Sequence, residues 1–252
     1  MHISVVIITH NEERNIRRCL TSTQDVADEI VVVDSGSTDK TEEICNEFGV
    51  KFVKQPWLGY SEQKNFANNL ATNDWILSID ADEELSDELK YSIIKLKNKV
   101  ITDDNVFSMN RLTNYCGHWI RHCGWYPDRK IRIWNRNVGQ WQGEIHETIE
   151  FSTETREIVL QGDLLHYSFA TVQDYENQQF KFAKMRGEHY FQKGKKHASF
   201  YMVVSPIFSF IQHYFFQLGF LDGKDGLHIC RITAKATRLK YKTLKELTDK
   251  KL

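Results

Sequence analysis

Four short apolar runs, separated by polar segments with helical patterning, mark the first 80 residues of the chain. The runs cover residues 3–8, 29–34, 50–54 and 75–79. Apolar runs without strict alternation are typical of strands that are buried on both faces of a parallel sheet. The intervening segments 12–20, 40–48 and 60–71 have the pattern of helices. This alternation of strand and helix predicts right-handed crossovers and a mostly parallel sheet, which is an α/β fold class.

The pattern changes beyond residue 80. A charged, solvent-facing helix is expected over residues 83–99, then shorter strands rich in Trp, Arg and His over 105–169, and a helix over 171–196. Residues 198–221 contain no Asp, Glu, Lys or Arg. Their length would permit a membrane span, but polar residues and Pro206 dilute the segment. We expect an aromatic segment at a membrane interface, with an ordinary core helix as the alternative.

The charge of the chain is unevenly distributed along its length. The formal net charge is −1, but residues 1–179 carry 18 basic and 29 acidic residues, whereas residues 180–252 carry 15 and 5. A uniformly basic coat for nucleic acid is therefore excluded, and an anionic membrane surface is the expected partner of the basic C-terminal part. Five scattered cysteines and the absence of a signal-peptide core at the N-terminus predict reduced thiols and a cytoplasmic location.

Three of the four predicted strands end on polar residues that can carry chemistry, in the segments Thr9–Glu12, Asp34–Ser37 and Asp80–Glu83. The carboxyl ends of parallel strands meet at one edge of a sheet, where α/β proteins bind ligands. Asp80 and Asp82 can hold Mg²⁺ or Mn²⁺ that completes its coordination on phosphate oxygens. A D-x-D pair alone is weak evidence, because a solvated acidic turn has the same sequence.

A nucleotide at this edge would need its phosphates neutralised by a metal and by side chains. The chain has neither a G-x-G-x-x-G nor a G-x-x-x-x-G-K-[ST] phosphate cradle. Lys64, on the helix before the fourth strand, is a candidate phosphate ligand, with a solvated helix charge as the alternative. Asp34 is a candidate acceptor for a base or ribose donor.

Three motifs in this order resemble those of the inverting family 2 glycosyltransferases with the GT-A fold. They are VVIITHNE at 5–12, VVVDSGSTD at 31–39 and WILSIDADE at 75–83. The segments Gly124–Asp128, Arg132–Trp134, Gly143–Glu147 and 215–226 are similar to the bacterial subgroup that adds a hexose to the lipopolysaccharide core. The resemblance covers nearly the whole chain.

The resemblance implies a role for individual residues. Asp34 would read the uracil or ribose, Asp80 would lie near the ribose and phosphates, and Asp82 would ligate the metal that bridges the diphosphate. The remaining residues of the nucleotide pocket would be Thr9, Asn11, Glu12 and Ser35. The implied reaction moves a hexose from a nucleotide sugar, taken as UDP-hexose, to a lipid-linked or cell-envelope glycan at the inner face of the cytoplasmic membrane.

The domain organisation expected from the pattern and the resemblance has two parts. Residues 1–170 would form the GT-A catalytic domain, with a nucleotide-sugar-binding half at 1–100 and an acceptor-side half at 101–170. Residues 171–252 would form a helical, membrane-proximal extension.

An inverting transfer also needs a carboxylate that removes the proton of the acceptor hydroxyl. Asp128, Glu144 and Glu147 are the candidates, and Glu147 is favoured because His146 and Glu147 close the aromatic, Gly-containing stretch Trp141–Gly143. Glu147 and Asp82 are thus the expected catalytic residues. His166, after a further strand, is a candidate metal or diphosphate ligand, with a satisfied core histidine as the alternative.

Two other functions stay open at this stage. A nucleotidyltransferase on a related fold would need a basic, Gly-rich loop after the first strand, where this chain has the acidic segment ending at Glu12. A non-catalytic sugar-nucleotide or membrane-binding module is the other. A zinc site built from Cys116, His118, His122 and Cys123 is disfavoured, because the last two are neighbours and would point to opposite faces of a strand.

Overall fold

The computed structural model describes residues 1–143 and 147–250, and the chain divides into two compact units. The sheet unit comprises Met1–Arg111 and Asp128–Tyr167. The helical unit comprises Leu112–Pro127 and Ser168–Leu252. Each unit has its own buried core, so each is described by itself.

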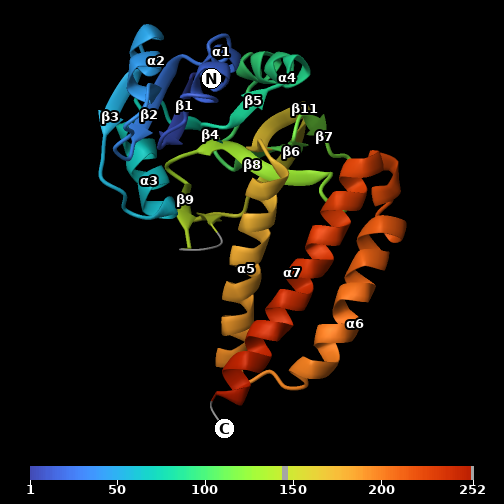
Figure 1. Ribbon diagram of the computed structural model, residues 1–252. Helices are drawn as coiled ribbons and strands as arrows, with labels where there is room; N and C mark the ends of the chain where they lie inside the picture. The colour runs from blue at the N-terminus through green and yellow to red at the C-terminus, as the bar shows by residue number, and fades with distance from the viewer. Residues whose placement is uncertain (144–146, 251–252) are drawn as a thin grey trace. The chain divides into compact units, whose positions relative to one another are not determined.

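The sheet unit is built on a mixed sheet in the order β3-β2-β1-β4-β8-β6-β11-β5 (Figure 1). Strands β1 to β4 pair in parallel, as the alternating pattern predicts. The pairs β4–β8, β6–β8 and β5–β11 are antiparallel. The α/β class is thus confirmed, and the later strands are antiparallel because the described residues between β6 and β11 form no crossover helix. The strands that lie wholly or partly in this unit are β1 (Ile3–Thr9), β2 (Glu29–Asp34), β3 (Lys51–Lys54), β4 (Trp75–Asp80), β5 (Glu83–Leu85), β6 (Asn105–Tyr115), β8 (Asp128–Asn135), β9 (Gly139–Gln142), β10 (Thr148–Phe151) and β11 (Arg156–Phe169).

Four helices cover the two faces of this sheet. One face packs on α1 (Ile16–Thr23), α2 (Thr41–Glu47) and α4 (Asp87–Lys97), which bury their apolar sides against strand residues such as Val5. The other face packs on α3 (Tyr60–Leu70) and on the β9–β10 hairpin. With helices on both faces, the parallel strands are buried on both sides, which explains their continuous apolar runs.

The structure differs from the predicted helix over residues 83–99 at its beginning. Glu83–Leu85 form strand β5, which pairs with β11, and α4 begins only at Asp87. Glu83 is fully buried beside an arginine, and the Ser86 hydroxyl accepts a hydrogen bond from the Leu89 N–H and caps the helix. A strand partner and a good N-cap residue therefore fix the boundary that the charge pattern misplaced.

The helical unit contains three long helices, of which the first two each run alongside the third (Figure 1). Its elements are β7 (His118–Trp119), α5 (Val172–Gln192), α6 (Ala198–Ile211), the π-helical turn Gln212–Phe216, the 3₁₀ turn Gly219–Asp222 and α7 (Gly223–Asp249). Tyr115, Phe169 and Tyr175 form an aromatic core with Ile229 of α7. No helix in residues 1–143 and 147–250 is long and apolar enough to cross a membrane.

The cysteine and histidine cluster of the helical unit is tied to carboxylates. His118 Nδ1 lies 2.7 Å from the Asp225 carboxylate, and His122 Nδ1 lies 2.9 Å from that of Asp222. Cys123 Sγ lies 3.7 Å from Cys230 Sγ. Each histidine therefore has its own acidic partner.

Candidate functional site

The loops after β1 and β2 are fastened to each other at the carboxyl edge of the sheet. The Asn11 N–H donates to Ser37 Oγ at 2.8 Å, and Asn11 Oδ1 accepts from the Thr38 N–H at 2.8 Å. The Glu12 N–H donates to Thr41 Oγ1 at 2.8 Å. Two of the three predicted chemical segments therefore lie side by side, as parallel topology requires.

Asp34 organises the loop that follows it. Its carboxylate is buried and accepts from the N–H groups of Gly36 and Ser37, at 2.9 and 2.8 Å, and from the Ser37 hydroxyl. Gly36 has a φ of +92°, a conformation that suits glycine. The Ser35 hydroxyl accepts from the side chain of Gln63 on α3 at 3.2 Å. Asp34 thus shapes this loop from within.

Asp80, the first carboxylate of the D-x-D motif, is held between two cations. Lys64 Nζ lies 3.2 Å from Oδ1, and Arg132 Nη2 lies 3.2 Å from Oδ2. Burial by itself would raise the pKa of Asp80, but Lys64 and Arg132 lower it well below its ordinary value. Asp80 is therefore an anion at neutral pH whose charge is compensated by the protein.

Arg132 also neutralises Glu83, which lies inside the sheet unit. Arg132 Nη2 donates to Glu83 Oε1, and Glu83 Oε2 accepts from the backbone N–H of Asp80 at 2.9 Å. Both side chains are almost completely buried. Burial raises the pKa of Glu83, and Arg132 opposes that effect. Glu83 thus fixes the backbone N–H of Asp80, and Arg132 fixes its carboxylate.

Asp82, the second carboxylate of the motif, faces a histidine. His166 Nε2 on β11 lies 3.2 Å from Asp82 Oδ2, and the Tyr167 N–H donates to the Asp82 backbone oxygen at 2.9 Å. His166 Nδ1 is buried and has no hydrogen-bond partner among the residues that the structure describes. The structure thus brings together Asp82 and His166, two of the residues that were predicted as metal ligands.

Lys64 connects α3 to the segment before β10. Its ammonium lies 2.8 Å from Glu147 Oε2 and 4.6 Å from the centre of the Trp141 ring. The Lys64 side chain is only 7% exposed. Burial lowers its pKa, but Asp80 and Glu147 raise it by a larger amount, so Lys64 is cationic at neutral pH. The predicted phosphate ligand and the favoured base are therefore direct neighbours.

Of the other two candidate bases, the structure describes the surroundings of Asp128 only. Asp128 is bound to Arg111 through Nε and Nη2 at 3.0 and 2.7 Å and to Lys130 at 2.9 Å. Burial would raise the pKa of Asp128, but these cations lower it. Glu144 lies outside the described residues. Of the two described candidates, Glu147 is the one that shares a cation with the D-x-D motif.

Glu12 and Thr9, two residues of the predicted nucleotide pocket, have unusual surroundings. Burial raises the pKa of Glu12, with smaller contributions in the same direction from Asp82 and Asp80, while a hydrogen bond from Asn15 lowers it. The hydroxyl of Thr9 is buried and has no partner within the described part of the chain. Both features suit an edge that receives a cation or a polar ligand.

Sequence reasoning missed the role of Arg132 and the burial of Glu83. A signal was present, because Arg132 is flanked by Ile131 and Ile133 in a strand pattern. An arginine between apolar strand residues indicates a buried ion pair, but its acidic partner lies 49 positions away.

Comparisons with known proteins agree with the motifs. The family model described as "Glycosyl transferase family 2" matches residues 4–148. An uncharacterized glycosyltransferase of Rickettsia typhi is 32% identical over 98% of this chain and 88% of its own. The lipopolysaccharide core biosynthesis glycosyltransferase LpsC of Rhizobium meliloti is 27% identical over 92% of this chain and 84% of its own.

Among solved structures, glucosyl-3-phosphoglycerate synthase from Mycobacterium tuberculosis, in complex with Mn²⁺, UDP and glucosyl-3-phosphoglycerate, is 26% identical. The match covers 45% of this chain and 44% of that chain, with a TM-score of 0.36.

Proposed function

The chain belongs to glycosyl transferase family 2, a family that uses nucleotide sugars, and from this premise we propose that it transfers the hexose of a UDP-hexose to a cell-envelope glycan with inversion at the anomeric carbon. Family membership decides against the nucleotidyltransferase and the non-catalytic module as first choices. One observation carries the residue assignment: Lys64 joins Asp80 of the D-x-D motif to Glu147, which lies 83 positions after Lys64 in the chain.

The nucleotide end of the donor would lie over the joined loops after β1 and β2. Thr9, Asn11 and Glu12 come from the first loop, and Asp34 and Ser35 from the second. Asp34 uses its carboxylate to fix the loop, so its contribution includes the shape that the loop presents to the base and ribose. Lys64 and Asp80 mark the diphosphate end.

A divalent cation, Mg²⁺ or Mn²⁺, would be held by Asp82 and His166. The donor set fits, because a carboxylate and an imidazole lie within 3.2 Å of each other, and the described residues place no lysine or arginine beside Asp82 comparable to Lys64 or Arg132 beside Asp80. Among the described residues no group of three or more acidic, histidine or cysteine side chains is placed to hold a metal, so phosphate oxygens would complete the coordination. When bound, the cation neutralises charge on the diphosphate.

Glu147 would act as the general base. It accepts the proton of the acceptor hydroxyl while that oxygen bonds to the anomeric carbon, and the bond from this carbon to the diphosphate oxygen breaks. The ammonium of Lys64 stabilises the negative charge that develops on the departing nucleoside diphosphate. Asp128 is less suited, since Arg111 and Lys130 occupy its carboxylate and lower its pKa.

The acceptor would be a glycan attached to lipid, met at the inner face of the cytoplasmic membrane. Similarity to the lipopolysaccharide core protein of Rhizobium meliloti supports this class of acceptor. Helix α6 and the turns after it also support it, because they carry no charged residue up to Leu221 and expose many large apolar side chains: Phe200, Val203, Ile207, Phe208, Phe215, Phe216 and Leu221. Basic residues flank this uncharged surface and give residues 180–252 a net charge of +10, a combination that suits insertion beside anionic headgroups.

The proposed division of labour follows the chain. Residues 1–170 would perform catalysis, with donor residues in 1–100 and acceptor-side residues in 101–170. Residues 171–252 would hold the enzyme peripherally on the membrane, in the cytoplasm.

Donor turnover by the purified protein tests the proposal. We expect UDP release from a UDP-hexose that requires Mg²⁺ or Mn²⁺, and a rise in melting temperature when UDP and metal are added. A screen of nucleotide sugars with mass spectrometry of products identifies donor and acceptor. If no nucleotide sugar is turned over and none raises the melting temperature, the proposed donor class is wrong.

A further inference from the structure

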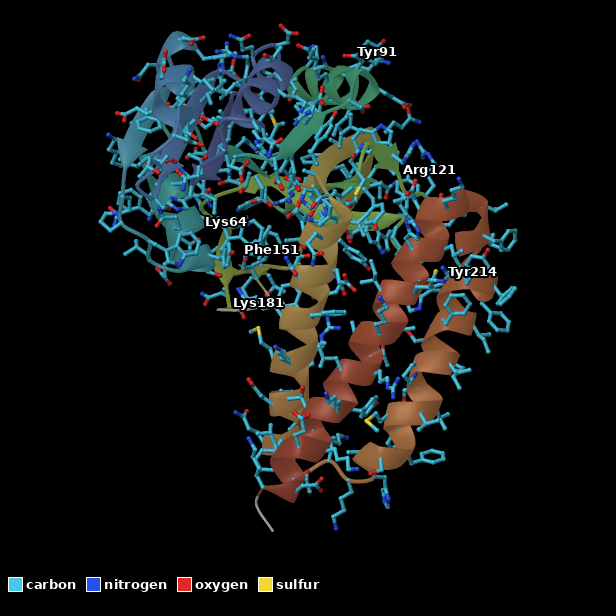
Figure 2. The ribbon with its side chains drawn as sticks, in the orientation of Figure 1. Lys64, Tyr91, Arg121, Phe151, Lys181 and Tyr214 are labelled. Atoms are coloured by element: carbon cyan, nitrogen blue, oxygen red, sulfur yellow. The ribbon has the colours of Figure 1, made fainter. Side chains whose placement is uncertain are left out.

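Lys64 links the D-x-D motif to Glu147, the proposed base. It lies on α3 (labelled in Figure 2), and its side chain reaches Asp80 at the end of β4. There its ammonium contacts Asp80 at 3.2 Å and Glu147 at 2.8 Å. The Trp141 ring covers a further side at 4.6 Å. An ammonium has three N–H donors, so two carboxylates and a ring leave little room for another ligand.

The two carboxylates are not equally attached to Lys64. Asp80 is also held by Arg132, and its backbone N–H donates to Glu83, so several bonds keep it in place. For Glu147, Lys64 is the one ion-pair partner that the described residues provide. An anion that competes for the ammonium would therefore displace Glu147 more readily than Asp80.

We propose that Lys64 is a positioning residue shared between the base and the donor: in the free enzyme it restrains Glu147, and the donor diphosphate takes its place. This inference rests on the proposed function, because it takes Glu147 as the base and a nucleoside diphosphate as the leaving group. A diphosphate at the D-x-D edge meets Lys64 because the ammonium touches Asp80, two residues before Asp82. Charge-assisted bonds to phosphate are strong enough to compete with one carboxylate.

Two consequences follow for the reaction. Glu147 becomes free to accept the acceptor proton only after the donor has bound, so the donor binds before the acceptor. The unproductive ion pair also weakens donor binding, because the diphosphate must displace a carboxylate and lies near its negative charge. Removing the charge of Glu147 should therefore strengthen nucleotide binding, a result that a base acting only on the acceptor does not predict.

UDP binding in the presence of Mg²⁺, measured by isothermal titration calorimetry on the full chain, provides the test. We expect Glu147→Gln to bind UDP about tenfold more tightly than the wild type, which corresponds to about 1.4 kcal/mol. Glu150→Gln removes an exposed carboxylate three positions away and should leave the affinity unchanged. In a Lys64→Met background, Glu147→Gln should produce no gain, because the shared cation is gone.

The outcomes separate this inference from the function on which it rests. If the wild type binds UDP and Glu147→Gln binds it equally or more weakly, the sharing of Lys64 is refuted while the donor class stands. The inference is also refuted if Glu150→Gln raises the UDP affinity equally, or if the gain from Glu147→Gln persists in the Lys64→Met background. In either case the loss of any nearby negative charge would explain the tighter binding. If the wild type binds neither UDP nor another nucleoside diphosphate, the proposed function and the inference fail together.

Discussion

Arg132 offers the sharpest test of the electrostatic support beneath the D-x-D motif. Its side chain is 4% exposed and donates to Glu83, which has no exposure, and to Asp80. Replacing Arg132 by Met would leave Glu83 as a buried carboxylate that keeps only the Asp80 N–H and the more distant Arg111, whose Nη1 lies 3.8 Å from Oε1, as partners among the described residues. Removing one member of a buried ion pair costs about 3–5 kcal/mol, and we expect a loss of that size in the sheet unit.

The assay must report on the sheet unit alone, because the chain has two units. Hydrogen exchange of peptides that span β4 and β8, followed by mass spectrometry, gives the free energy of opening there. Arg17→Met is a matched control, since its ion pair with Glu47 is about half exposed and should contribute less than about 1 kcal/mol. In the double variant Arg132→Met/Glu83→Gln, much of the lost stability should return.

The loss of stability caused by Arg132→Met should also depend on pH. Burial raises the pKa of Glu83, and removing Arg132 takes away the largest opposing effect. A carboxyl with a raised pKa binds more protons in the folded state than in the unfolded state, so it destabilises the fold as pH rises through the folded pKa. The defect of Arg132→Met should therefore be largest at neutral pH and shrink as pH falls toward the ordinary value of 4.5. A defect no larger than that of Arg17→Met, or one independent of pH, would refute the reasoning.

Three further predictions concern the metal, the base and the membrane. Asp82→Asn should weaken metal-dependent UDP binding at least about tenfold, measured by calorimetry with and without Mn²⁺; unchanged metal dependence would contradict the assignment. Glu147→Gln should lower kcat by about 10²- to 10⁴-fold, whereas Asp128→Asn, measured in the same transfer assay, should lower it much less; the reverse order would make Asp128 the base. Phe208→Ser removes an apolar side chain that is 65% exposed and should reduce co-sedimentation with anionic vesicles. Tyr91→Ser, at a similarly exposed position on α4 (labelled in Figure 2), should leave co-sedimentation unchanged. Equal binding by both variants and the wild type would contradict the proposed lipid contact.

The sequence predicted the parallel half of the sheet unit closely. The second strand was expected over residues 29–34 and has those bounds in the structure. Buried parallel strands need continuous apolar residues, and their carboxyl ends need polar ones, so both signals are local. For the same reason the D-x-D motif could be placed at a sheet edge from its position after Ile79. The family followed from three such local motifs and is confirmed by the comparisons.

What the local pattern could not supply was the pairing of charges. Glu83 belongs to a charged run that predicts an exposed helix, yet it lies buried in β5 because Arg132 on β8 neutralises it. Lys64 had a solvated helix charge as its alternative, and its burial depends on Glu147 and Asp80 approaching it.

The sequence by itself therefore determined which carboxylates and cations are available and at which edge of the sheet they gather. Only the tertiary structure decided which of them are neutralised by each other and which remain open to a ligand. The physical reason is that an ion pair in a protein interior depends on distance and burial, and both arise from residues tens of positions apart in the chain.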